Sequence, residues 1–243
     1  LFVGWGIFFI YTLIRFRASK NTKAEYSGVR NHYSSYLEAG VAVIEVALLI
    51  GFAFPIWASR VNDVPIDKEA VQIRVVGQQF AWNIHYPGPD GVFGNSSVDL
   101  VDEAENPIGL DRSDDFAKDD VVTVNQLHIP VNTPINISLS TKDVIHSFSL
   151  TELRVKQDAI PGMEIPVWFE ATMTSEEFLK TTIGTGREGK GFEIACAQLC
   201  GLGHYRMKGF LTVHNDEGYS AWLQEEQKYL EEEEDDDWGD DEW

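Results

Sequence analysis

The stretch IACAQLCGLGHYRMKGF, residues 194–210, carries the chemistry that decides what this sequence encodes. It contains both cysteines of the chain, Cys196 and Cys200, followed by His204 and Met207. Thiolate, imidazole and thioether ligands together favour copper, especially Cu(I), over hard cations. The stretch therefore predicts a copper site.

Other interpretations of the two cysteines stay open on the residues alone. A disulfide forms readily in an oxidising compartment but gives His204 and Met207 no role. Structural zinc sites rarely use a thioether, and a mononuclear blue-copper site uses only one cysteine. Two coppers bridged by both thiolates would use both cysteines and need a second histidine. His146 in DVIHSFSL is the candidate, and His128 in NQLHIP is its rival.

The sequence upstream of this stretch predicts a β-rich domain over residues 61–215. Apolar and polar residues alternate in short runs, as at Val71, Ile73 and Val75, which is typical of half-buried strands. We predict strands within residues 71–86, 120–130, 134–141, 143–150, 165–173, 191–197 and 208–215. Such strands close as an antiparallel sandwich or a small barrel. Residues 87–119 are polar and acidic without a sustained period, which predicts a long surface loop.

Two apolar segments precede that domain and predict a transmembrane hairpin within residues 1–60. The run 36–58 is long enough to cross a bilayer, which takes about 20 residues. The run 1–14 is shorter, and we expect it to be the end of a hydrophobic segment that is truncated at its start. The linker between the runs is basic, which places it on the cytoplasmic side and the rest of the chain outside.

The charge distribution limits the classes of partner that the chain can bind. The chain carries 39 acidic and 19 basic residues, a net charge of −20. An acidic surface excludes nucleic acid as a partner and favours a basic protein. Residues 216–243 predict a helix that runs into the acidic block EEEEDDDWGDDEW, which we interpret as a solvated, disordered tail, with docking of a basic partner as the alternative.

These features together resemble subunit II of cytochrome c oxidase in the heme-copper oxidase family, from residue 1 to about residue 225. The resemblance rests on the Cys-x3-Cys-x3-His-x2-Met spacing, the strand VIHSFSL, the segment LRVKQDAIPGM and the two apolar runs. It implies a cupredoxin-like Greek-key domain with a dinuclear copper A centre. The implied ligands are the bridging thiolates of Cys196 and Cys200, the imidazoles of His146 and His204, the thioether of Met207 and the backbone carbonyl of Gln198.

The resemblance also implies a function and a set of partners. The chain would accept electrons from a cytochrome c and pass them to heme in catalytic subunit I, which reduces oxygen and pumps protons across a bacterial inner membrane. No Cys-x2-Cys-His motif is present, so the donor would be a separate protein. A membrane-anchored copper carrier is the alternative that the residues alone leave open.

The resemblance also implies roles for residues outside the copper ligands. Trp82 matches an aromatic position where electrons enter, and Phe80 stands where the family commonly has tryptophan. Glu38 coincides with a glutamate at the mouth of a proton-uptake channel, and Glu45, seven residues later, lies on the same helix face without a counterpart. The family commonly has glutamate at Gln198, and its carboxylate binds magnesium. A neutral amide holds magnesium more weakly, so the magnesium site stays open.

Overall fold

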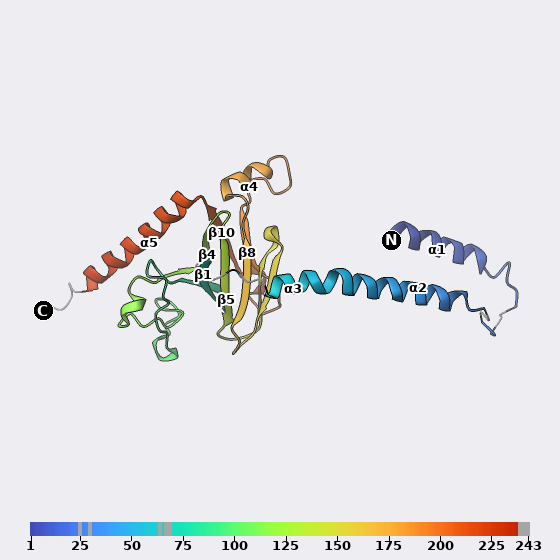
Figure 1. Cartoon of the computed structure of the whole chain (residues 1–243), viewed down its shortest axis with the longest axis horizontal. Coiled ribbons are helices and arrows are strands. Elements are labelled where there is room, and N and C mark those ends of the chain that lie inside the picture. Colours follow the sequence, from blue (N-terminus) through green and yellow to red (C-terminus); the bar gives the residue numbers. More distant parts are fainter. Residues whose placement is uncertain (24–25, 29–30, 63–64, 66–69, 238–243) are drawn as a thin grey trace. The chain divides into compact units, whose positions relative to one another are not determined.

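The computed structural model describes residues 1–23, 26–28, 31–62, 65 and 70–237 (Figure 1). The chain divides into two compact units, Leu1–Asp63 and Val64–Trp243. The larger unit carries all the described β-strands, and the smaller one is helical.

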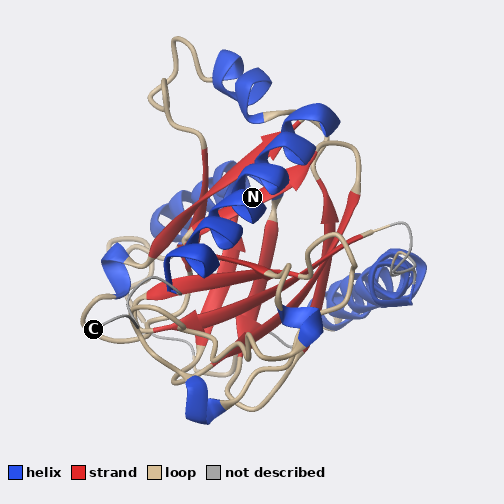
Figure 2. Cartoon of the chain, turned by 90° about the vertical axis from the view of Figure 1, so that its left-hand side faces the viewer, coloured by secondary structure: helices blue, strands red, loops and turns tan. Residues whose placement is uncertain are grey.

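Two five-stranded sheets build the larger unit (Figure 2). One has the order β3-β2-β1-β5-β8 and the other the order β4-β10-β9-β6-β7. Strand pairs are antiparallel except β1 with β5 and β10 with β4, which are parallel. The strands are β1 Val71–Gln78, β2 Ala81–Tyr86, β3 Val121–Val124, β4 Gln126–Pro130, β5 Pro134–Thr141, β6 His146–Leu150, β7 Val155–Ala159, β8 Ile165–Glu170, β9 Phe192–Cys196 and β10 Lys208–His214.

Side chains that alternate along the strands form the core between the sheets. In β5, Ile135, Ile137 and Leu139 are buried while the residues between them are half-buried. Phe148 and Ile194 of the other sheet are also completely buried and belong to the same cluster. Burying a side chain of this size contributes roughly 1.5–3 kcal/mol, so the alternation that is visible in the sequence is what holds the sheets together.

The strands depart from the predicted runs where the backbone turns. The run 71–86 is interrupted at Gln79 and Phe80, so that it forms the hairpin β1–β2. The run 120–130 divides at Asn125, whose φ of 60° is left-handed, and its two halves join different sheets as β3 and β4. Asparagine tolerates this conformation better than most residues do. Strand β7 was not predicted because its residues are mostly polar.

Short helical elements connect the strands. Helix α4, Ser175–Thr181, was not predicted, although Thr174 and Glu177 form a capping box at its start. The structure also contains the 3₁₀-helical segments η2 Val98–Leu100, η3 Asp115–Ala117, η4 Thr151–Leu153 and η5 His204–Arg206.

The segment 87–119 contains the short helical turns η2 and η3 and no long strand or helix, and a buried pair fixes its ends. His85 Nε2 lies 2.6 Å from Asp120 Oδ2, and the two side chains are 2% and 0% exposed. The same carboxylate oxygen accepts a bond of 2.8 Å from the backbone N–H of Gly94. Phe93 also packs edge-on against His85. The long loop is thereby attached to β2 and to the start of β3.

Helix α5, Asp216–Asp237, packs against the β4–β10 edge through Trp222. The indole stacks on His128 at 4.3 Å between ring centroids and is 9% exposed, whereas Tyr229 is 55% exposed. The helix continues through the acidic residues 231–237, where we expected a disordered tail. Glutamate has a high helix propensity, and the run extends a helix that Trp222 already anchors. The rest of that tail lies outside the described residues.

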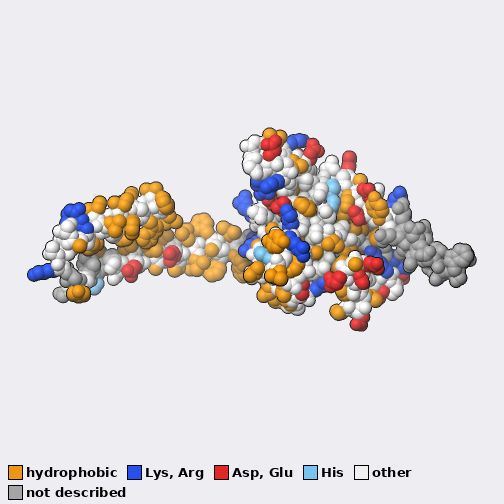
Figure 3. Space-filling model, turned by 180° about the vertical axis from the view of Figure 1, so that it is seen from behind, with side chains coloured by type: hydrophobic (Ala, Val, Ile, Leu, Met, Phe, Trp, Pro, Cys, Tyr) orange, Lys and Arg blue, Asp and Glu red, His pale blue; other side chains and the backbone are white. Residues whose placement is uncertain are grey.

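The smaller unit contains helix α1, Phe2–Arg15, and a continuous helix over Tyr33–Asn62. The latter consists of α2 Tyr33–Leu48, the π-helical turn η1 Leu49–Ala53 and α3 Phe54–Asn62. The turn ends two residues before Pro55, which lacks a backbone donor. Apolar side chains cover these helices (Figure 3). Among the described residues, Tyr33–Asn62 is the one helix long and apolar enough to cross a membrane, with a mean hydropathy of 2.3, and α1 is shorter.

Candidate metal centre

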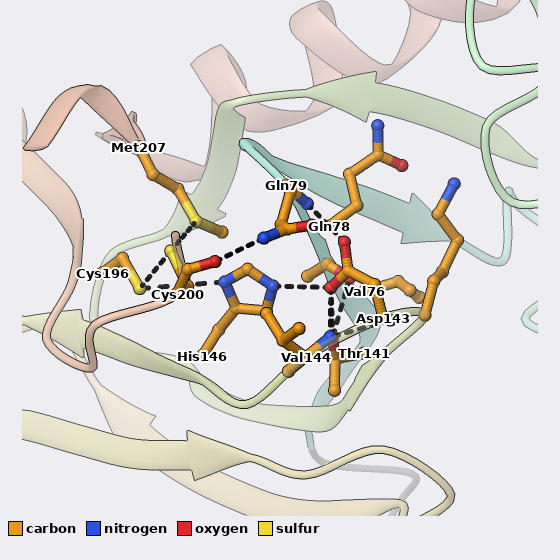
Figure 4. A network of polar contacts seen from close by, with 12 residues as sticks. Val76, Gln78, Gln79, Thr141, Asp143, Val144, His146, Cys196, Cys200 and Met207 are labelled. Carbon is orange, nitrogen blue, oxygen red and sulfur yellow. Dashed lines mark hydrogen bonds and ion pairs between the residues drawn. The ribbon is translucent and has the colours of Figure 1, made fainter. Parts of the chain in front are cut away.

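The predicted ligands meet at one end of the second sheet (Figure 4). His146 begins β6 and Cys196 ends β9, and because these strands pair antiparallel, the start of one lies beside the end of the other. Cys200 follows in the loop after β9, His204 begins η5, and Met207 precedes β10. A strand pair and one loop thus collect residues that are 50 positions apart in the chain.

The donor atoms lie close to one another. The Sγ atoms of Cys196 and Cys200 are 3.7 Å apart, whereas a disulfide bond measures about 2.05 Å, so both cysteines are free. The other distances are Cys196 Sγ to His146 Nδ1 3.8 Å, Cys196 Sγ to Gln198 O 3.1 Å, Cys200 Sγ to His204 Nδ1 3.6 Å and Cys200 Sγ to Met207 Sδ 3.7 Å.

These contacts divide the donors into two similar halves. One half joins a cysteine sulfur to an imidazole and a backbone carbonyl, and the other joins a cysteine sulfur to an imidazole and a thioether. A closed four-ligand zinc site leaves the thioether and the carbonyl without a role. The donor set fits two copper ions that share both sulfurs, because each half then supplies one nitrogen and one weak ligand.

The histidine of β6, the two cysteines and the methionine are buried, and the thiol of Cys200 is protonated at neutral pH when no metal is bound. His146 is 0%, Met207 2%, Cys200 4% and Cys196 9% exposed. Burial, together with the hydrogen bond and charge of the neighbouring Cys196, raises the pKa of Cys200 to about 11. Since copper binds the thiolate, loading the site releases protons.

Asp143 orients His146, and the sequence analysis missed it. Its Oδ1 lies 2.8 Å from His146 Nε2 and accepts a bond of 2.6 Å from the N–H of Val144. Burial raises the pKa of Asp143, but hydrogen bonds from His146 and from the N–H groups of Val144 and Gln79 outweigh it and lower that pKa. The sequence signal was available, because ligating histidines commonly bond to a carboxylate, here three residues earlier.

Of the two aromatic residues that we expected near the site, Trp82 contacts a ligand and Phe80 contacts the loop that carries the ligands. Trp82 is 0% exposed and its ring packs edge-on against His146 at 5.9 Å. Phe80 is half-buried and lies so close to Gly203 that a Cβ there would be 2.3 Å from the ring. Phe80 therefore lies nearer the surface than Trp82.

The remaining candidates lie apart from this cluster. His128 Nδ1 is 2.8 Å from His214 Nε2 and the ring stacks on Trp222, so its contacts belong to the α5 interface. The group of three possible metal ligands found within the described residues is His146, Cys196 and Cys200, and His128 is not in it. Glu38 and Glu45 lie in α2 of the smaller unit.

Comparisons with known proteins identify the family of this chain. The family model described as cytochrome c oxidase subunit II, periplasmic domain, matches residues 71–213. The chain is 33% identical over 224 residues to the alternative cytochrome c oxidase subunit 2 of Bradyrhizobium diazoefficiens, which covers 92% of this chain and 74% of that protein. It is 26% identical over 231 residues to cytochrome c oxidase subunit 2 of Cereibacter sphaeroides, with 89% and 68% covered.

A solved structure is also similar. The crystal structure of the periplasmic domain of subunit II of cytochrome oxidase from Bradyrhizobium japonicum is 28% identical, covers 69% of this chain and 99% of that chain, and has a TM-score of 0.45.

The matches confirm three predictions. The fold class is a cupredoxin-like β-domain preceded by apolar helices. The protein is a subunit of a heme-copper oxidase, which is an oxidoreductase complex, and it acts there in electron transfer. The family match over residues 71–213 and the 33% identity to a relative that covers 92% of this chain lead to one conclusion: this chain belongs to the cytochrome c oxidase subunit II family.

Proposed function

We propose that this chain carries electrons from a cytochrome c to heme in subunit I of the oxidase through a dinuclear copper A centre. The proposed ligands are His146, Cys196, the carbonyl of Gln198, Cys200, His204 and Met207. The observation that supports this most directly is the division of the donors into two halves around a pair of sulfurs 3.7 Å apart.

The chain's own residues prepare this site before metal binds. Asp143 holds His146 with Nδ1 toward Cys196, and the β6–β9 pairing fixes both residues on neighbouring strands. Trp82 closes the inner side of the imidazole and excludes water there. Two copper ions held by these residues would supply one-electron transfer, and the rigid ligand arrangement would keep the structural change on reduction small.

We propose that electrons enter near Phe80, with Trp82 between Phe80 and the core. Phe80 packs on the glycine of the ligand loop, and Trp82 contacts a ligand imidazole. Three apolar side chains of the same loop, Leu199, Leu202 and Tyr205, are 74%, 98% and 86% exposed. A donor with a basic face suits the net charge of −20, because charge complementarity raises the rate of encounter.

For the membrane part we propose two spans, α1 and α2–α3, in a bacterial inner membrane, with the copper domain on the periplasmic side. Glu38 would lie at the entrance of proton uptake. Magnesium at the interface with subunit I gains no support from Gln198, because its side chain is an exposed neutral amide.

Electron paramagnetic resonance of the copper-loaded full chain tests the proposal. A seven-line mixed-valence signal with two coppers per chain is expected, because one electron is shared between two nuclei. A four-line mononuclear signal contradicts it. The copper-carrier alternative predicts that the assembled complex does not consume oxygen with reduced cytochrome c, whereas the proposed function predicts steady uptake.

A further inference from the structure

Gln79, in the turn between β1 and β2, contacts both segments that carry the ligands (Figure 4). Its backbone N–H donates a bond of 2.7 Å to Asp143 Oδ2. Its side-chain Nε2 donates a bond of 2.5 Å to the carbonyl of Cys200. One residue is thus bonded to the support of His146 on one side and to a ligand cysteine on the other.

This contact comes from the opposite sheet. Strands β1 and β2 belong to the first sheet, whereas β6, β9 and β10, which flank the ligands, belong to the second. Cys196 is held by the pairing of β9 with β6, but Cys200 lies in the loop beyond the end of β9. The amide of Gln79 therefore restrains the cysteine that the sheet does not hold.

The ligand loop is shaped to receive this turn. Gly201 has a φ of +134°, and a Cβ there would lie 2.6 Å from Gln79 Nε2. A Cβ at Gly203 would be 2.3 Å from the ring of Phe80, the next residue of the turn. A side chain at Gly201 would displace the amide of Gln79, and a side chain at Gly203 would collide with the ring of Phe80, so both glycines favour this contact.

We infer that Gln79 is a positioning residue that holds the two ligand-bearing segments at their spacing before metal binds. Gln79 holds the backbone carbonyl of Cys200 in place. The position of that carbonyl sets how far the sulfur of Cys200 lies from the other donor atoms of the site. The consequence for copper rests on the proposed function, but the consequence for the metal-free loop does not.

The test uses the full chain in detergent, with two leucine variants. Gln79→Leu removes the side-chain amide and keeps the backbone N–H that binds Asp143. Gln78→Leu is the matched control, because Gln78 is the adjacent glutamine and bonds to Asn83 and Glu103 instead of the ligand loop. The first measurement is amide hydrogen exchange over residues 197–207 of the metal-free chain. The second is the rate of copper release to a chelator.

In Gln79→Leu we expect loop amides to exchange about tenfold faster and copper to leave about 10- to 100-fold faster, the range typical of residues that support metal ligands. Exchange in β5 and β6 should not change, and Gln78→Leu should match the wild type in both measurements. Equal loop exchange or equal copper release in the two variants overturns the inference.

Two further outcomes are distinguishable. If Gln79→Leu does not fold, Gln79→Glu keeps the length of the side chain but presents an acceptor to the Cys200 carbonyl, and the same two changes are expected. If the wild-type chain shows no two-copper signal, the proposed function fails, and loop exchange alone decides whether Gln79 holds the loop.

Discussion

Asp143 Oδ1 lies 2.8 Å from His146 Nε2, and the other ring nitrogen of His146 lies 3.8 Å from the sulfur of Cys196. The lowered pKa of Asp143 keeps its carboxyl ionised, so it can only accept a hydrogen bond. Nε2 is therefore the ring nitrogen that donates to Asp143, which favours the tautomer whose Nδ1 lone pair points toward the sulfur. This pair sets the tautomer that a metal requires.

Replacing Asp143 by asparagine should weaken copper binding by about 10- to 100-fold, because the amide can donate to Nε2 and favour the wrong tautomer. Competition with a Cu(I) chelator measures the affinity. Asp158→Asn is the control, since Asp158 is an exposed acid on the neighbouring strand β7. Equal affinity in both variants would show that the carboxylate does not orient the ring.

His146→Ala should abolish the two-copper signal, and His128→Ala should retain it. Of these two histidines, His146 lies within reach of a cysteine sulfur, whereas His128 bonds to His214 and stacks on Trp222. The paramagnetic resonance spectrum and the copper content per chain distinguish the two. Retention of the signal in His146→Ala together with its loss in His128→Ala would overturn the ligand assignment.

Acidification should destabilise the metal-free domain through the contact between β4, β10 and α5. Burial and the charge of His214 lower the pKa of His128 to about 4 from 6.5, and burial lowers the pKa of His214. Between these pH values the unfolded chain binds protons that the folded chain does not. The contribution of His128 is complete above about pH 6.5 and is lost as the pH falls through about 4.

The loss from His128 amounts to roughly 3 kcal/mol at most, because one pKa unit corresponds to about 1.4 kcal/mol. Denaturant unfolding at pH 7 and pH 5 measures the part that is lost over this range, roughly 2 kcal/mol or less. His128→Phe keeps an aromatic ring against Trp222 without a titrating group, so its stability should depend less on pH. An unchanged pH dependence in that variant would remove His128 from the explanation.

Asp120→Ala should lower the free energy of unfolding by roughly 3 kcal/mol, because it leaves His85 and the N–H of Gly94 buried without their partner. The segment 87–119 should also be cleaved faster in limited proteolysis. Asp115→Ala is the control on the same loop, since the pair of Asp115 with Lys118 is exposed and contributes little. Similar losses in both variants would show that the buried pair of His85 and Asp120 does not hold the ends of this segment.

The sequence predicts those parts of the fold that depend on local pattern. The alternation in residues 134–141 corresponds to β5 and its buried isoleucines, because one face of that strand meets the core. The division of 120–130 at Asn125 was not predictable, since both halves alternate and only the pairing partners reveal that they join different sheets. Strand β7 was not predicted from the sequence because it is held by pairing with β6 and has a short apolar face.

The residues of the site likewise include some that the sequence predicts and some that it does not. The cysteines, His204 and Met207 lie within one stretch, so their chemistry is legible from their spacing. Asp143 could have been found from its distance of three residues from His146. Gln79 could not, because it reaches Cys200 across 121 residues and from the other sheet, a contact that no local period records.

Gln198 should be replaceable without loss of copper, because its backbone and not its side chain faces the site. Its carbonyl oxygen lies 3.1 Å from the sulfur of Cys196, while the residue is exposed. Gln198→Ala should therefore keep the two-copper signal and a copper release rate within about twofold of the wild type, whereas Cys200→Ser should lose the signal. Gln198→Glu should also keep the copper signal. In the assembled oxidase this variant should retain Mn²⁺ after a chelator wash that removes Mn²⁺ from the wild type, because hard cations prefer a carboxylate to an amide. Loss of the copper signal in Gln198→Ala would mean that the side-chain amide is a ligand. The backbone carbonyl of Gln198 would then not be the weak ligand of its half of the site.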